Sequence, residues 1–372
     1  MKIKILGLYP MQGNGGIASW TKKFLATFPD EEYKICPVNI APDKDFTKFS
    51  GTDRILYGIK AIVRIRKDIS GILKQNPDIQ VMHITTGGGF GALRDNTVAR
   101  ICRKHGIKTI MHCRFGTIKE FYEGNKLTSW VSRKNLELYD RIWVLDRRSA
   151  DFLRTIPDIK DKIELTPNSI EVPEECDLRP KSYKRVGFVG NIVPTKGIFE
   201  LVEAISYLDN GTELFIVGQG LDVDINRIKT IAGEKLGKNI HLLGRLPNAE
   251  AVSLMETLDI IALPTYYAGE AFPISILEAM SRGKLVISCP RAAIPDMLTA
   301  IDGTLCGILV SDKDSKAIAD SIEWCQDHND VADEMCKKAY EKVKTAYRKE
   351  VVYEIYRENY RKLLQIDTDS NN

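Results

Sequence analysis

The chain has 372 residues, of which 44% are hydrophobic and 28% charged, and its net charge is +3. This length predicts two domains, and this composition excludes a disordered chain, a collagen and a small disulfide-stapled protein. No apolar run approaches the roughly 20 residues that span a bilayer, and the N-terminal run, interrupted by Lys4, does not resemble a signal peptide. We therefore expect a cytoplasmic protein, in agreement with eight scattered cysteines that lack zinc spacing.

Positive charge is concentrated in the first part of the chain, where residues 1–150 hold 26 Lys and Arg against 14 Asp and Glu. This excess favours an anionic partner, either nucleic acid or an anionic membrane surface. A solvated basic surface without a partner is the alternative.

Strands and helices alternate from the N-terminus, which predicts parallel sheets covered by helices. In the first half, strands are expected at 2–8, 33–38, 79–84, 108–112, 141–145 and 162–165, and helices at 17–28, 54–75, 91–105 and 128–139. In the second half, strands are expected at 185–189, 213–217, 239–243, 258–263 and 285–288, and helices at 197–208, 222–236, 249–256, 274–282 and 314–327.

A linker separates the two halves, because residues 167–184 are acidic and punctuated by Pro167, Pro173 and Pro180. We predict two Rossmann-like α/β domains, 1–175 and 182–349, that face each other across a cleft. The charged tail from about 331 to 364 is predicted to be helical, and its segment at about 350–365 to pack back on the first domain.

Two glycine-rich loops follow predicted strands in the first half. Gly15 and Gly16 end the loop that starts at Gly13, before a helix, and this is either an anion-binding loop or a plain strand-to-helix turn. The order is not Gly-x-Gly-x-x-Gly, so a nicotinamide dinucleotide is disfavoured. The run Gly87–Gly91 is predicted to be a simple turn, with an anion-binding or flexible acceptor loop as the alternative.

Four charged or titratable positions are candidate site residues, and three of them follow apolar strands. His112, beside Arg114, ends one strand and is either a site residue or a buried core histidine. Lys196 lies near a predicted helix start, where a cation opposes the helix dipole unless a phosphate lies between them. Glu270 follows a strand, and Glu278 lies inside the next helix between apolar residues, where a carboxylate needs hydrogen-bonding partners such as the two hydroxyls of a ribose.

No metal is assigned, since the Asp-x-Asp pairs are explained by helix capping or by an ordinary loop. The segments 190–197, 214–220, 240–244, 259–264, 270–283 and 294–296 occur in an order that resembles the retaining glycosyltransferases of family 4. Residues 185–300 carry most of this resemblance, and Gly15, Gly16, His112 and Asn168 extend it more loosely to the first half. The resemblance implies the GT-B fold and a metal-independent, hexosyltransferase-type enzyme.

The resemblance also implies roles for individual residues. Three residues would be catalytic. Glu270 would lie near the transferred sugar, Lys196 would neutralise the leaving diphosphate, and His112 would contact the donor sugar. Arg114, Arg147 and Arg148 are acceptor-side candidates, and one of them would replace the arginine that the family usually has at Asn191. The implied donor-binding residues are Gly15, Gly16, Asn191, Gly218, Arg245, Leu246, Ala271, Phe272, Pro273, Ile274 and Glu278.

The expected function is transfer of a sugar from a UDP- or GDP-sugar to a lipid-linked glycan in cell-surface polysaccharide biosynthesis. No further cofactor and no nucleic acid are expected, and the protein would be peripheral at the inner membrane face. Two departures, Asn191 and Ala271 where the family usually has Arg and Gly, keep open a non-catalytic nucleotide-sugar-binding subunit. A sugar-nucleotide epimerase of the same fold is the other alternative.

Overall fold

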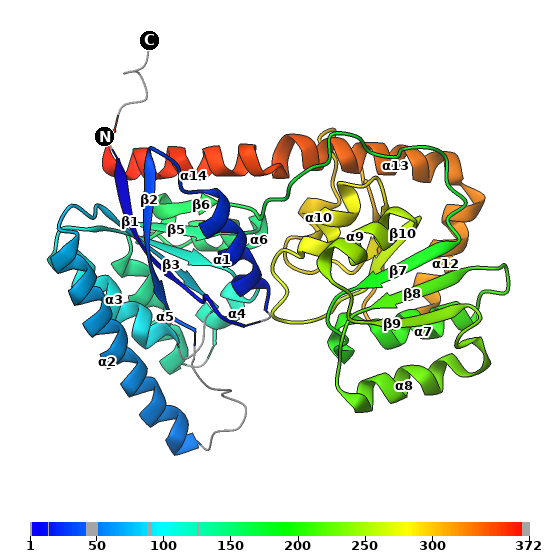
Figure 1. Cartoon of the computed structure of the whole chain (residues 1–372), viewed down its shortest axis with the longest axis horizontal. Coiled ribbons are helices and arrows are strands. Elements are labelled where there is room, and N and C mark those ends of the chain that lie inside the picture. The colour runs from blue at the N-terminus through cyan, green and yellow to red at the C-terminus, as the bar shows by residue number, and fades with distance from the viewer. Residues whose placement is uncertain (1, 14, 42–50, 88–90, 125, 367–372) are drawn as a thin grey trace, which may run out of the picture. The chain divides into compact units, whose positions relative to one another are not determined.

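The computed structural model describes residues 2–13, 15–41, 51–87, 91–124 and 126–366. The chain forms two compact units (Figure 1). The first unit combines Met1–Thr166 with Tyr353–Asn372, and the second spans Pro167–Val352. The segment 167–175, predicted as the end of the first domain, is therefore grouped with the second unit.

The first unit is built on a six-stranded sheet with the order β2-β1-β3-β4-β5-β6. All neighbouring strands are parallel, so their carboxyl ends lie along one edge. The strands are β1 (Ile3–Tyr9), β2 (Tyr33–Asn39), β3 (Val81–Thr86), β4 (Lys108–Cys113), β5 (Arg141–Val144) and β6 (Ile163–Leu165).

Helices cover both faces of this sheet. The connection from β1 to β2 runs in one direction along the sheet, and the later connections run in the opposite direction. Because crossovers between parallel strands are right-handed, α1 covers one face of the sheet, and α2, α3, α5 and α6 cover the other. The C-terminal helix α14 joins α1, and aromatic side chains of the two helices pack together. Their bounds are α1 (Gly16–Thr27), α2 (Gly51–Gln75), α3 (Gly91–Lys104), α4 (Ile118–Tyr122), α5 (Lys126–Leu138), α6 (Arg147–Arg154) and α14 (Lys349–Leu364).

The second unit has a six-stranded sheet with the order β12-β11-β10-β7-β8-β9, again with parallel neighbours. Its strands are β7 (Arg185–Val189), β8 (Glu213–Val217), β9 (Ile240–Gly244), β10 (Ile260–Leu263), β11 (Leu285–Ser288) and β12 (Ile308–Leu309). Its helices are α7 (Ile198–Ser206), α8 (Asp222–Ala232), α9 (Asn248–Glu256), α10 (Ile274–Met280), α11 (Ile294–Met297), α12 (Ser315–Asp327) and α13 (Asn329–Lys342).

The predicted helical tail is interrupted before its last segment. After α13, a π-helical turn (Val343–Tyr347) leads to Arg348, whose ψ of 140° is extended, and α14 follows. The cause is a distant segment: Ile170 donates its N–H to the Tyr347 carbonyl and accepts from the Lys349 N–H. This bridge anchors the segment after Pro167 in the second unit.

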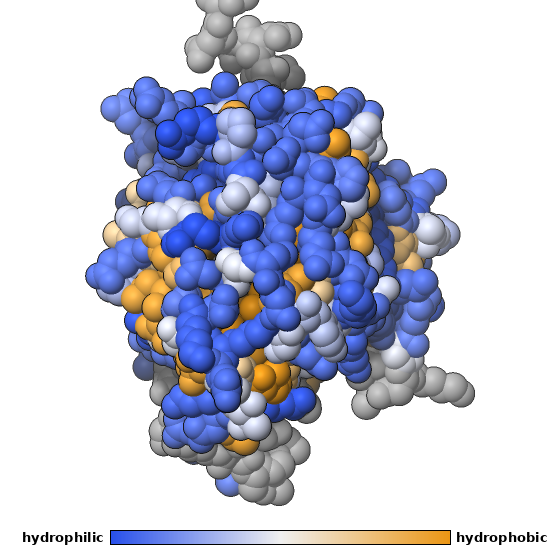
Figure 2. Space-filling view, turned by 90° about the vertical axis from the view of Figure 1, so that its right-hand side faces the viewer, coloured by the Kyte–Doolittle hydropathy of each residue, from blue (hydrophilic) through white to orange (hydrophobic). Residues whose placement is uncertain are grey.

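Helices that could cross a membrane are absent from the described part of the chain, since none is both long and apolar enough. The face drawn in Figure 2 is mainly hydrophilic, with smaller apolar patches. Such a mixed surface is usual for folded domains.

Candidate functional site

The loops at the carboxyl edge of the second sheet are held together by backbone contacts. Ile192 donates its N–H to the Gln219 carbonyl (2.8 Å), and Gly218 donates to the Gly244 carbonyl (2.9 Å). A Cβ added at Gly218 would lie 1.8 Å from the Gly190 carbonyl oxygen, so no other residue fits there. Three strand ends thus form one rigid rim.

Lys196 is presented by a tight turn at this edge. The short helix Pro194–Lys196 ends at Gly197, which has a φ of +74° and caps α7. A Cβ at Gly197 would lie 2.1 Å from the Pro264 carbonyl oxygen, so the glycine lets the loops after β7 and β10 meet. The structure therefore places Lys196 directly before α7, as the sequence predicts.

Glu270 pairs with Lys196 across the two loops. The side chains of Lys196 and Glu270 are 20% and 11% exposed, and Thr265, fully buried, reaches the Glu270 carboxylate at 3.5 Å. The Lys196 ammonium also lies 5.6 Å from the centre of the Tyr267 ring. A cation and a carboxylate are thus held together in a mostly enclosed place.

The segment between Glu270 and Glu278 leads into α10. Ala271, Phe272 and Pro273 are buried, Ile274 begins the helix, and Glu278 is half-buried in it. Asn168 fixes the segment, because its side-chain amide donates to the Phe272 carbonyl (2.8 Å). Asn191, by contrast, is exposed.

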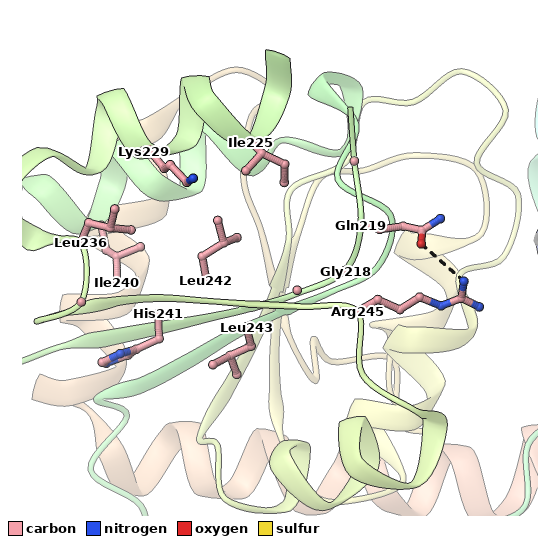
Figure 3. A pocket seen from close by; sticks show the side chains of 13 residues that line it. Gly218, Gln219, Ile225, Lys229, Leu236, Ile240, His241, Leu242, Leu243 and Arg245 are labelled. Carbon is pink, nitrogen blue, oxygen red and sulfur yellow. Dashed lines mark hydrogen bonds between the residues drawn. The ribbon is translucent and has the colours of Figure 1, made fainter. Parts of the chain in front are cut away.

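An open pocket of about 740 Å³ follows the edge strand β9 up to the same rim (Figure 3). Just past the carboxyl end of β9, Arg245 donates to the Gln219 side-chain carbonyl (3.4 Å; right of Figure 3). Gln219 is a rim residue that the sequence-based set omits, and its signal is the position between Gly218 and Gly220 after a buried strand. Leu246, half-buried, follows Arg245.

His112 lies at the end of β4 in the first unit, in a chain of fully buried polar side chains. Its Nδ1 is 3.2 Å from Nε2 of His83, whose Nδ1 is 2.7 Å from the Tyr360 hydroxyl on α14. The Arg114 guanidinium lies 3.1 Å from His112 Nε2 and 4.0 Å from the centre of the Trp20 ring. The contact of His112 with a sugar stays a prediction, because the structure shows this ring enclosed.

Arg114 determines where the protons lie in this chain. An arginine only donates, so His112 Nε2 accepts, and the His112 proton is on Nδ1, donated to His83. The His83 proton is then on Nδ1, donated to Tyr360. Both rings are neutral, because burial, together with Arg114, lowers the pKa of His83 to about 3 and that of His112 well below its usual value.

Other predicted residues of the first unit lie at or beside the same carboxyl edge. Gly15 caps α1 and Gly16 begins it, and a Cβ at either would meet nothing within 4 Å, so packing does not explain these glycines. Arg147 begins α6, and Arg148 pairs with Glu120 on the surface. Of the second glycine run, residues 88–90 lie outside the described residues.

Metal-ligating side chains do not converge in the described ranges: no group of three or more His, Cys, Asp or Glu is placed to hold an ion. The Lys196–Glu270 pair joins opposite charges at the rim of the second sheet.

The chain has the GT-B fold, with two open parallel sheets, each covered by helices, and loops at the carboxyl edges of the strands. The structure of sucrose-phosphate synthase from Thermosynechococcus elongatus superposes with a TM-score of 0.76 at 15% identity, covering 98% of this chain and all of that one. HepE of Anabaena in complex with UDP gives 0.68 at 14% identity, with the same coverage of both chains.

The similarity to a particular family lies in the second unit. Residues 175–342 match the model of glycosyl transferases group 1. The putative teichuronic acid biosynthesis glycosyltransferase TuaC of Bacillus subtilis is 23% identical over 296 residues, 76% of this chain and 71% of TuaC. The chain spans only about 40% of the length of the first curated relatives that it matches.

Proposed function

We propose that the protein is a retaining glycosyltransferase that uses a nucleotide-diphosphate sugar. The observation that carries the proposal is the Lys196–Glu270 pair at the carboxyl edge of the group 1 domain, with Glu278 eight residues further on. HepE, which shares the fold, was solved with UDP, which supports a nucleotide donor. Gln219 and Arg245, at the end of the pocket just past the carboxyl end of β9, would lie near the base.

The proposed chemistry is a front-face displacement. The incoming hydroxyl attacks the anomeric carbon on the face from which the diphosphate leaves, the bond to the diphosphate breaks, and the leaving phosphate takes the hydroxyl proton. Lys196 stabilises the growing negative charge, as a preorganised cation does in a partly enclosed site. No metal is required in this scheme. Glu270 holds Lys196 in place and faces the sugar, and Glu278 binds the ribose hydroxyls.

The acceptor is proposed to be a lipid-linked glycan of cell-surface polysaccharide assembly at an anionic membrane surface. The basic first half supports this setting, and TuaC is named for the biosynthesis of teichuronic acid. Packing does not explain why Gly15 and Gly16 lack side chains, and we propose that their backbone approaches the donor diphosphate. His112 would act on the donor sugar from the first unit. Arg114, Arg147 and Arg148 are the acceptor-side candidates.

Thermal unfolding with UDP, GDP, ADP and CMP tests the donor site. A nucleotide at 100 times its dissociation constant stabilises the folded protein by about 2.7 kcal/mol. One nucleotide should raise the midpoint of the wild type and of the control Glu250→Ala, an exposed glutamate of α9, but not of Glu278→Ala. If no nucleotide shifts the midpoint, the donor site is refuted.

Turnover with radiolabelled sugar nucleotides then tests the reaction. Formation of a new glycosidic bond with retained anomeric configuration, lost in Glu270→Gln, supports the proposal. Donor binding without any product favours the non-catalytic subunit that Asn191 and Ala271 keep open, and an altered sugar still attached to the nucleotide favours the epimerase.

A further inference from the structure

The geometry of the first unit points to a docking surface for an anionic lipid bilayer, formed by the starts of α2, α3 and α5. We call it the edge patch and define it by Leu56, Ile59 and Val63 of α2, Leu93 of α3 and Trp130 of α5. The inference rests on the membrane setting proposed above, but it does not depend on the donor site of the second unit, so the two can fail separately.

In the described part of the first unit, the exposed large apolar side chains lie on three helices. Among the described residues of the first unit, the edge patch contains every large hydrophobic side chain that is exposed, with exposed fractions from 55% to 61%. The helices α2 and α3 contact each other, as do α3 and α5. Clustering on three adjacent helices differs from the single scattered apolar residues of an ordinary surface.

The edge patch projects from the body of the unit because of how α2 is built. The buried residues of α2, Ile65, Ile69 and Leu73, all lie in its second half. No described side chain before Ile65 in this helix is buried, and Figure 1 shows this end reaching beyond the sheet. Leu56, Ile59 and Val63 follow an i, i+3, i+7 pattern, which puts them on one outward face.

The helices that carry these apolar side chains are basic. The three helices together carry 13 Lys and Arg against 4 Asp and Glu. Lys60 and Lys67 are exposed on α2, next to the apolar face. An outward face that combines branched aliphatic and aromatic side chains with lysine and arginine is typical of segments that lie in the interface of an anionic membrane.

Charge and chemistry favour the bilayer over other occupants. A second copy of the chain would bring two strongly basic surfaces together, which disfavours self-association. Nucleic acid would be held by the charge alone and would leave Leu56, Ile59 and Val63 without a role. An anionic bilayer uses both components, because its lipid head groups attract the cations and its acyl boundary accepts the apolar side chains.

Sedimentation of the full chain with vesicles tests the inference. Vesicles of phosphatidylcholine with phosphatidylglycerol should bind the protein at low salt, and phosphatidylcholine alone should bind at least tenfold more weakly. Leu56→Gln/Ile59→Gln/Val63→Gln should reduce binding to the mixed vesicles at least tenfold. Lys60→Gln should reduce it about fivefold.

A matched control is Leu221→Gln/Val223→Gln, which removes two side chains of the second unit that are 70% and 69% exposed, and it should bind as the wild type does. Equal binding of the triple variant and the wild type overturns the inference, as does equal binding to both kinds of vesicle. Wild-type binding to an acidic protein or to RNA, but not to anionic vesicles, overturns it as well. The nucleotide-dependent thermal shift of the triple variant should remain, which separates this result from a failed donor site.

Discussion

Lowering the pH from 7 to 5 should destabilise the first unit through its two buried histidines. The folded pKa of His83 is about 3, and that of His112 lies well below its ordinary value, whereas both titrate near 6.5 in the unfolded chain. Below pH 6.5 both histidines bind a proton in the unfolded state but stay neutral in the folded state, so the free energy of unfolding falls as the pH drops. Each histidine contributes a loss of about 2 kcal/mol at pH 5, and the pair about 4 kcal/mol.

Urea unfolding followed by tryptophan fluorescence measures this effect. Trp20 and Trp143 report on the first unit, because their rings lie 5.4 Å from His112 and 4.8 Å from His83, centre to centre. His83→Gln should halve the loss between pH 7 and pH 5, and His105→Gln, an exposed histidine of the same unit, should leave it unchanged.

Carboxylates also change the stability between pH 7 and pH 5, and comparing the variants with the wild type cancels their contribution. Burial raises the pKa of Asp95, which favours the folded state at low pH, and backbone and Arg357 hydrogen bonds lower that of Asp30, which acts in the opposite direction. Both are present in every variant. If His83→Gln loses as much stability between pH 7 and pH 5 as the wild type, the argument from the buried neutral pair is refuted.

Three further substitutions test the packing and the proposed chemistry. Lys196→Ala should lower turnover at least 100-fold while the thermal midpoint stays within a few degrees, and unchanged turnover would remove this lysine from the mechanism. Gly197→Ala should cost about 2 kcal/mol or more of unfolding free energy, because its Cβ would meet the Pro264 carbonyl; Gly211→Ala, with a φ of +80° but open space, should cost less. Tyr360→Phe should cost about 1–3 kcal/mol by urea unfolding, since a buried imidazole N–H loses its acceptor.

Much of the fold follows from local patterns in the sequence. The strands β7, β8 and β11 have the predicted bounds, because each is a short apolar run between polar or turn-forming residues. The helix α6 is missed, since Arg147–Arg154 is rich in charge and only its Asp146 cap, which accepts the Ser149 N–H, marks its start.

Features set by distant segments could not be predicted in this way. The interruption before α14 depends on Ile170, which is far away in the chain and pairs with Tyr347 and Lys349. The buried chain of polar side chains around His112 also depends on a distant segment, since His83, which contacts His112, contacts Tyr360 277 residues away. The sequence therefore indicates that His112 ends a strand, but its burial and its proton position follow only from tertiary packing.

The C-terminal helix completes a core that the first 166 residues leave open. In parallel strands, alternate side chains point to one face, so His83, His112 and Trp143 face α1 and α14 rather than the other helices. Without α14, the His83 N–H would lose Tyr360, and the rings around it would be exposed. A chain that ends at Arg348 is therefore expected to unfold its first unit at lower urea concentration and to bind the dye ANS, which reports exposed apolar surface. An unchanged urea midpoint for that unit would show that α14 is not part of its core.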